Sequence, residues 1–191
     1  MATLRIYNNN SDTSQVSNNR NNYSISRLDN NIEKIEDLII DEKDKIYIDL
    51  ENVTYTNANQ LPWYEYRESI TRVIFEDEIM PVSMNYWFNG MINVEHIDVS
   101  KIDTSKITNM GGLFSSVGSN VTDSFEIVGL DNWNTSNVTN IGNMFEKSGV
   151  SATIWDIGDL SGWDVSKVTS YGNFNNWVQD KIIPPIWNTG S

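Results

Sequence analysis

The stretches IDTSKITNMGGLF at residues 102–114, WNTSNVTNIGNMF at 133–145 and WDVSKVTSYGNF at 163–174 are three copies of one pattern. Their first residues are 31 and then 30 positions apart, and VSMNYWF at 82–88 matches residues 108–114 at an offset of 26. A recurring period of about 20 to 50 residues is typical of repeat architectures. We therefore expect about four repeats that stack into a solenoid.

An apolar triplet precedes each copy, in which two residues separate the first two apolar positions and one residue separates the last two. The four sets are Ile70, Val73 and Phe75; Val94, Ile97 and Val99; Phe125, Val128 and Leu130; and Trp155, Gly158 and Leu160. This spacing resembles the core of leucine-rich repeats, in which a short strand directs the triplet inward and pairs in parallel with the next strand.

The copies themselves form the returning half of each unit. Ser or Thr precedes each run and is suited to cap a short helical or 3₁₀ turn, which brings apolar side chains to the core at helical spacing. We therefore predict an α/β solenoid over residues 70–174, with Phe114 and Phe145 stacked in register. Trp133 and Trp163 occupy the repeat position of Ile102 and are predicted to pack in the core.

The segments outside the repeats are predicted to close or anchor the solenoid. Residues 1–27 are Asn-rich and polar, which predicts an arm that is extended or ordered by a partner. Within this arm Leu4, Arg5, Ile6 and Tyr7 alternate in polarity and are candidates to join the sheet edge of another chain.

Residues 28–69 are predicted to form an N-terminal α+β cap. Leu28, Ile32, Ile35 and Ile39 recur at helical spacing and indicate a helix over about 30–42, and the alternation around Ile46–Leu50 indicates a strand. Residues 175–191 are predicted to form a C-terminal cap.

The run from Ile70 to Gly90 and the following MINVEHIDVSKIDTSKITNMGGLF resemble the BspA-type leucine-rich-repeat proteins, whose hallmark is close to W-D-V-S-N-V-T-N-M-x-x-M-F. The resemblance covers residues 70–174. It implies a bacterial surface protein that adheres to host or matrix molecules and has no catalytic activity. This chain differs from the family in its longer spacings, its few repeats, and the absence of export and wall-anchoring segments.

Charge and composition exclude several classes of partner. The 13 Lys and Arg against 26 Asp and Glu give a net charge of −13, with no basic stripe for nucleic acid. No stretch approaches the ~20 apolar residues needed to insert in a membrane, and residues 1–30 lack the apolar region of a secretory signal. With no Cys, the chain has no thiol nucleophile or thiolate metal site.

The inventory of catalytic groups is thin, and we expect no cofactor and no metal. His96 is the single histidine, and a structural or ligand-contact role is favoured over a catalytic one. Glu76, Asp77 and Glu78 form an acidic group that fits a solvated turn better than a hard-cation site. A surface role for Trp63, Tyr64 and Tyr66 stays open beside a packing role.

The outer side of the stacked strands is the face best suited to recognition, because a solenoid presents it as one continuous surface. Its candidate residues are Arg72, Ile74, Glu95, His96, Asp98, Ile127, Gly129, Ile157 and Asp159.

Two locations fit such a binding module. The first is an extracellular or cell-surface adhesion module whose partner is a protein or glycan on a host surface. The second is a bacteriophage virion or decoration protein, anchored in a larger assembly by its N-terminal arm. A glycan-active enzyme is a remote alternative, since it requires two carboxylates across a cleft.

Overall fold

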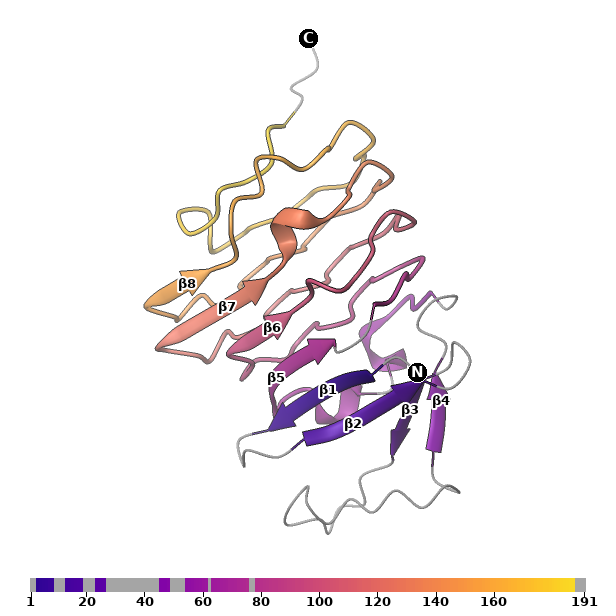
Figure 1. Cartoon of the computed structure of the whole chain (residues 1–191). Helices are drawn as coiled ribbons and strands as arrows, with labels where there is room; N and C mark the ends of the chain where they lie inside the picture. Colours follow the sequence, from indigo (N-terminus) through magenta and orange to yellow (C-terminus); the bar gives the residue numbers. More distant parts are fainter. Residues whose placement is uncertain are drawn as a thin grey trace.

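The molecule is described here by a computed structural model, which covers residues 3–8, 13–18, 23–26, 45–48, 54–61, 63–75 and 78–187. Its centre is an eight-stranded sheet in the order β4-β3-β2-β1-β5-β6-β7-β8. The strands are β1 (Thr3–Asn8), β2 (Thr13–Asn18), β3 (Tyr23–Ser26), β4 (Lys45–Ile48), β5 (Ile70–Phe75), β6 (His96–Asp98), β7 (Ser124–Val128) and β8 (Ile154–Asp156). Figure 1 shows β5 to β8 stacked with the turns behind them, between β1 to β4 at one end and the C-terminal turns at the other.

Strands β5 to β8 form a small parallel sheet, an arrangement compatible with a repeat-like solenoid. Val73 pairs with Ile97 and Ile97 with Ile127, so successive strands bring the same repeat position into register. All three side chains are buried. The predicted parallel pairing of successive strands is therefore confirmed.

The predicted inward triplets hold for β5 and β6 but are wrong at β7. Val128 is 40% exposed, whereas its neighbour Ile127 is 3% exposed and occupies the inner position. Gly129 has a left-handed backbone with φ of 99°, which adds one residue before the chain turns inward again at Leu130. The same correction applies to the last unit, where Ile157 is buried and Gly158 is exposed.

The returning halves are short turns, as predicted, and they do not continue into regular helices. The helices of the described residues are three 3₁₀ helices: η3 (Ala58–Gln60), η4 (Tyr64–Tyr66) and η5 (Leu130–Asn132). The repeat copies instead form four stacked turns, which we call the turn ladder. These turns are residues 84–90, 110–116, 141–147 and 171–177.

In the turn ladder every second backbone N–H donates a hydrogen bond to a carbonyl of the next turn and not to one of its own turn. The N–H groups of Met110, Gly112, Phe114 and Ser116 donate to the carbonyls of Asn140, Gly142, Met144 and Glu146 over 2.7 to 2.9 Å. The intervening N–H groups of Leu113 and Ser115 donate to the carbonyl three residues earlier. A continuous helix cannot form because half of its donors are used between turns.

The core is a stack of aromatic rings along the solenoid axis. Phe88, Phe114 and Phe145 lie with successive ring centroids 5.4 and 5.3 Å apart, and Trp133 stacks on Trp163 at 6.1 Å. All five side chains are buried. The predicted Phe114–Phe145 stack and the predicted core positions of Trp133 and Trp163 are confirmed.

The N-terminal segment differs from the predicted arm. β1 pairs antiparallel with β5 of the same chain, with Leu4 opposite Phe75 and Ile6 opposite Val73, and Arg5 and Tyr7 fall in the same register. β1 therefore pairs with a strand of its own chain, whereas we expected it to join the sheet edge of another chain. Backbone hydrogen bonds carry such pairing, so polar composition did not reveal it.

Strand β4 overlaps the strand predicted around Ile46–Leu50 and pairs with β3. The predicted helix over about 30–42 lies outside the described residues. Residues 54–69 cover the first turn of the ladder, where the Trp63 indole donates to the carbonyl of Trp87 over 2.6 Å.

Candidate functional site

The outer face of the parallel strands carries one row of charged side chains. Arg72 on β5 lies opposite His96 on β6, His96 opposite Glu126 on β7, and Glu126 opposite Asp156 on β8. Neighbouring strands lie about 4.8 Å apart, so the row forms a continuous polar stripe. Its basic members lie toward β5 and its acidic members toward β8.

The closest contact in this row joins His96 to Glu126. The His96 Nδ1 and the Glu126 Oε1 are 2.5 Å apart, and the Glu126 side chain is about half exposed. The contact holds the imidazole against the carboxylate on an open sheet face. This supports the structural or ligand-contact role that the sequence favours for His96.

A second row on the same face mixes polar and apolar side chains. Ile74 lies opposite Asp98, and Asp98 opposite Val128. On the other side of the first row, Ile154 on β8 lies opposite Ser124 and is 59% exposed. The face therefore combines charge with apolar groups that reach solvent, which is typical of recognition surfaces.

The structure brings only part of the predicted site to this face. Arg72, Glu95 and Asp159 are exposed, and Ile74, His96 and Asp98 are half-buried. Ile127, Ile157 and Gly129 are buried, so their prediction as outward residues is wrong. The cause is the extra residue at Gly129 in one unit and at Gly158 in the next, which moves the alternation by one position and brings Glu126, Val128 and Asp156 to the outside instead.

Two of the predicted binding carboxylates have a local structural role. The Asp98 Oδ1 accepts the N–H of Ser100 over 2.9 Å, and the Asp159 Oδ1 accepts the N–H of Ser161 over 2.8 Å. The hydrogen bonds from Ser161 hold the pKa of Asp159 below its usual value. These side chains stabilise turns at the ends of strands, and a ligand role for them stays a prediction.

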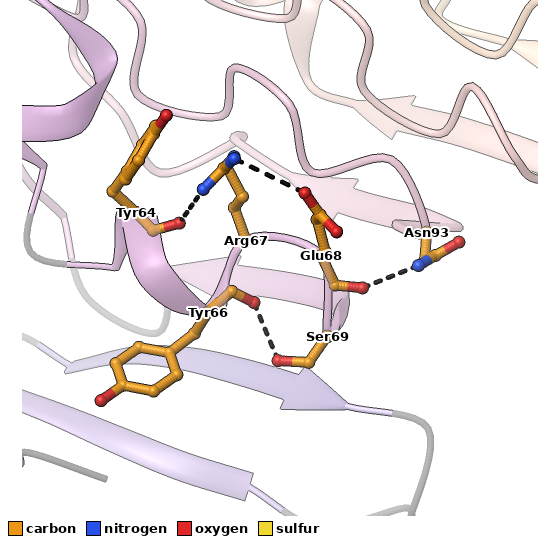
Figure 2. A network of polar contacts seen from close by, with 6 residues as sticks. All are labelled: Tyr64, Tyr66, Arg67, Glu68, Ser69 and Asn93. Carbon is orange, nitrogen blue, oxygen red and sulfur yellow. Dashed lines mark hydrogen bonds and ion pairs between the residues drawn. The ribbon is translucent and has the colours of Figure 1, made fainter. Parts of the chain in front are cut away.

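The aromatic group before the repeats divides between core and surface. Trp63 is buried, whereas Tyr64 and Tyr66 are half-buried. Figure 2 shows Arg67 lying between the Tyr64 carbonyl, which accepts its Nη1 over 2.6 Å, and the Glu68 carboxylate, 3.5 Å from its Nη2. The Asn93 amide donates to the Glu68 carbonyl, so this network joins the segment to the solenoid.

Sequence reasoning missed a second group of candidate residues, on the last turn of the ladder. Tyr171 occupies the repeat position of Ile141, yet Tyr171 is 56% exposed and Ile141 only 1%. Tyr171 lines a hollow of about 300 Å³ with Asn173, Asn175 and Trp187. The replacement of a core aliphatic residue by Tyr in the last copy was the available signal.

Among the described residues no cluster of three or more His, Cys, Asp or Glu side chains is arranged to hold a metal ion. Glu76 and Asp77, two members of the predicted acidic group, lie outside these residues. Within the same part of the chain, no helix has the length and apolar character to cross a bilayer.

Comparison with known proteins places the repeats in a family. The family model described as Mycoplasma protein of unknown function, DUF285, matches residues 82–179, which is just over half of the chain. No curated protein and no solved structure matches the chain.

Proposed function

We propose that this chain, which belongs to the DUF285 family of Mycoplasma proteins, is a binding module displayed on the outer surface of a cell. The module is built on about four leucine-rich-like repeats over residues 70–174, similar to those of BspA-type proteins. Residues 28–69 serve as its N-terminal cap and residues 175–191 as its C-terminal cap. Its partner is a protein or glycan on a host surface.

The outer face of β5 to β8 is the observation that carries this proposal. Four adjacent strands hold Arg72, His96, Glu126 and Asp156 in one register row, and the exposed Val128 and Ile154 lie beside it. Backbone pairing fixes the positions of these groups before a partner arrives. A preorganised surface loses little conformational entropy on binding.

The chemistry of this face supports binding rather than catalysis. The His96 imidazole has the Glu126 carboxylate as its hydrogen-bond partner, and the pair lies on an open sheet face. A nucleophile and a base within hydrogen-bond reach are the usual signature of nucleophilic catalysis. The contact that is present instead fixes two polar groups for recognition.

Cell-surface display is favoured over the virion alternative. The hypothesis of a virion component depended on an N-terminal arm free to join a partner assembly. In the structure β1 lies against β5, so the backbone edge of this segment is used within the chain. The family match and the repeat-like sheet both fit a surface repeat protein.

Antibody labelling of intact cells tests the display. An antibody raised against the purified chain is applied to living cells of the source organism before and after permeabilisation, and to bacteriophage particles purified from the same culture. Labelling of intact cells is expected. Labelling only after permeabilisation, or only on the particles, contradicts the proposal.

A matched pair of variants tests the binding face. The labelled chain is incubated with cultured cells of the host and counted by flow cytometry. Ile154→Glu places a charge on the face, whereas Ser151→Glu places the same charge on an exposed position before β8. Weaker binding of Ile154→Glu alone is expected, and equal binding of both variants contradicts the assignment of the face.

A further inference from the structure

The turn ladder ends in a row of backbone donors without acceptors. The N–H groups of each turn donate to the carbonyls of the turn that follows it toward the C-terminus. The donors of the third turn are Ile141, Asn143 and Phe145, and their acceptors are the carbonyls of Ser170, Gly172 and Phe174. The corresponding N–H groups of the last turn belong to Tyr171, Asn173 and Asn175. Within the part of the chain that the structure describes, these three have no hydrogen-bond partner.

These donors lie at a hollow where the chain returns across the last turn. The Trp187 ring lies 5.2 Å from the Tyr171 ring and 5.4 Å from the Phe174 ring, measured between centroids. The rings of Tyr171 and Trp187 are inclined by 33°. They give the hollow of about 300 Å³ an aromatic wall that solvent reaches.

The rest of the lining consists of amides. The Asn173 Nδ2 donates to the Asn143 Oδ1, and the Gln179 Nε2 donates to the Asn176 Oδ1, which leaves the other amide atoms of these pairs available. The Asn175 side-chain amide has no hydrogen-bond partner among the described residues. Donors and acceptors therefore lie beside one another in one small space.

Every residue that lines the hollow is uncharged. This is notable in a chain with a net charge of −13, because the surrounding field repels anions and the lining offers no carboxylate to a cation. A ligand that fits must be neutral and rich in hydroxyl groups. It must also present a flat apolar face to the aromatic wall.

We propose that this hollow, formed by Tyr171, Trp187 and the neighbouring amides, binds a neutral glycan. The C–H face of a sugar ring stacks on Tyr171, and its hydroxyl groups accept from the free N–H groups and exchange hydrogen bonds with Asn175. The inference rests on the proposed function as a binding module and names one class of ligand for it.

A peptide is the less favourable occupant of this hollow. A peptide that continued the ladder would need its carbonyls on alternate residues to meet the N–H row, and it would not use the aromatic wall. A sugar ring is compact enough to use the donors and the aromatic wall together.

Binding of the full chain to an array of neutral glycans, acidic glycans and unmodified peptides tests this inference. The best neutral oligosaccharide is then titrated against the chain and three variants, with the dissociation constant as the readout. Tyr171→Ala removes the stacking surface, and Asn175→Asp exchanges a donor for a charge without a change of shape. Trp177→Ala is the matched control, since Trp177 is 61% exposed on the same turn but does not line the hollow.

Neutral oligosaccharides are expected to bind, with affinity about tenfold weaker in Tyr171→Ala and in Asn175→Asp. Trp177→Ala is expected to bind like the parent chain. Circular dichroism of each variant verifies that the fold is retained.

Three results overturn the inference: binding only to acidic glycans or peptides, no binding to the array, or equal affinity of all variants. The proposed function is tested separately. If the parent chain binds host cells but no glycan of the array, the binding module stands and the glycan hollow fails.

Discussion

Phe114 and Phe145 stack face to face, with ring centroids 5.3 Å apart and ring planes 11° from parallel, although 31 residues separate them in the sequence. Neither side chain reaches solvent. The contact repeats one turn earlier between Phe88 and Phe114. Stability in this chain therefore depends on contacts between neighbouring turns, as expected for a solenoid.

Truncation of either ring is expected to leave a cavity that the stacked turns cannot fill. We expect Phe114→Ala and Phe145→Ala each to lower the free energy of unfolding by about 3–5 kcal/mol. Urea denaturation followed by tryptophan fluorescence measures this loss. Ile186→Ala is the control, because Ile186 is exposed and its truncation should change stability by no more than ~0.5 kcal/mol. A loss below ~1 kcal/mol in both Phe variants contradicts the stacked core.

The corrected register of β7 predicts opposite responses from adjacent residues. Ile127→Asp introduces a charge into the core and is expected to lower the free energy of unfolding by about 3 kcal/mol or more. Val128→Asp introduces the same charge on the outer face, at a cost of about 1 kcal/mol from lost strand propensity. The same urea measurement distinguishes the two variants. A larger loss of unfolding free energy in Val128→Asp than in Ile127→Asp contradicts the corrected register and supports the one predicted from the sequence.

Gly129 is required where the chain passes Ser100. Its φ of 99° is unfavourable for any residue with a Cβ, and a Cβ there would lie 2.5 Å from the Ser100 Cα. We expect Gly129→Ala to lower the free energy of unfolding by more than ~2 kcal/mol. Gly162→Ala is the control, since nothing lies within 4 Å of its added Cβ. Equal thermal stability of the two variants contradicts the strained turn.

Two carboxylates predict a loss of stability in acid. The Asp103 and Asp164 side chains accept hydrogen bonds from Ser105 and Ser166, which hold the pKa of each Asp below its usual value. A lowered pKa in the folded state stabilises the fold above about pH 4. This contribution is lost as the pH falls through the folded pKa. We therefore expect the urea midpoint to fall between pH 5 and pH 3.

Exchange of both carboxylates for amides tests the origin of this acid response. At the equivalent repeat position the Asn134 Oδ1 accepts the N–H of Ser136 over 3.1 Å. The double variant Asp103→Asn with Asp164→Asn is therefore expected to retain the turn contacts. The double variant is expected to lose less stability than the parent between pH 5 and pH 3. Asp180→Asn is the control, because Asp180 accepts no hydrogen bond among the described residues. An unchanged slope in the double variant assigns the acid response to other groups.

The parallel strands and most of the core positions could be predicted from the amino-acid sequence alone. Ile97, Phe114 and Trp133 were predictable because a stacked repeat places the same kind of side chain at the same position in each copy. The spacing of the copies also indicated which rings meet. These features follow from the periodicity of the sequence, which can be recognised without knowledge of the three-dimensional contacts.

The other features could not be predicted from the sequence, because each depends on a contact between segments that are far apart in the chain. The ladder hydrogen bonds of Gly112 and Ser116 replace a helix that local sequence favours, and the turn at Gly129 exchanges Ile127 for Val128 in the core. The pairing of β1 with β5 is likewise a long-range backbone contact without a signature in composition. The hollow at Tyr171 exists because the ladder stops there, so that a repeat position which is core in every earlier turn becomes surface.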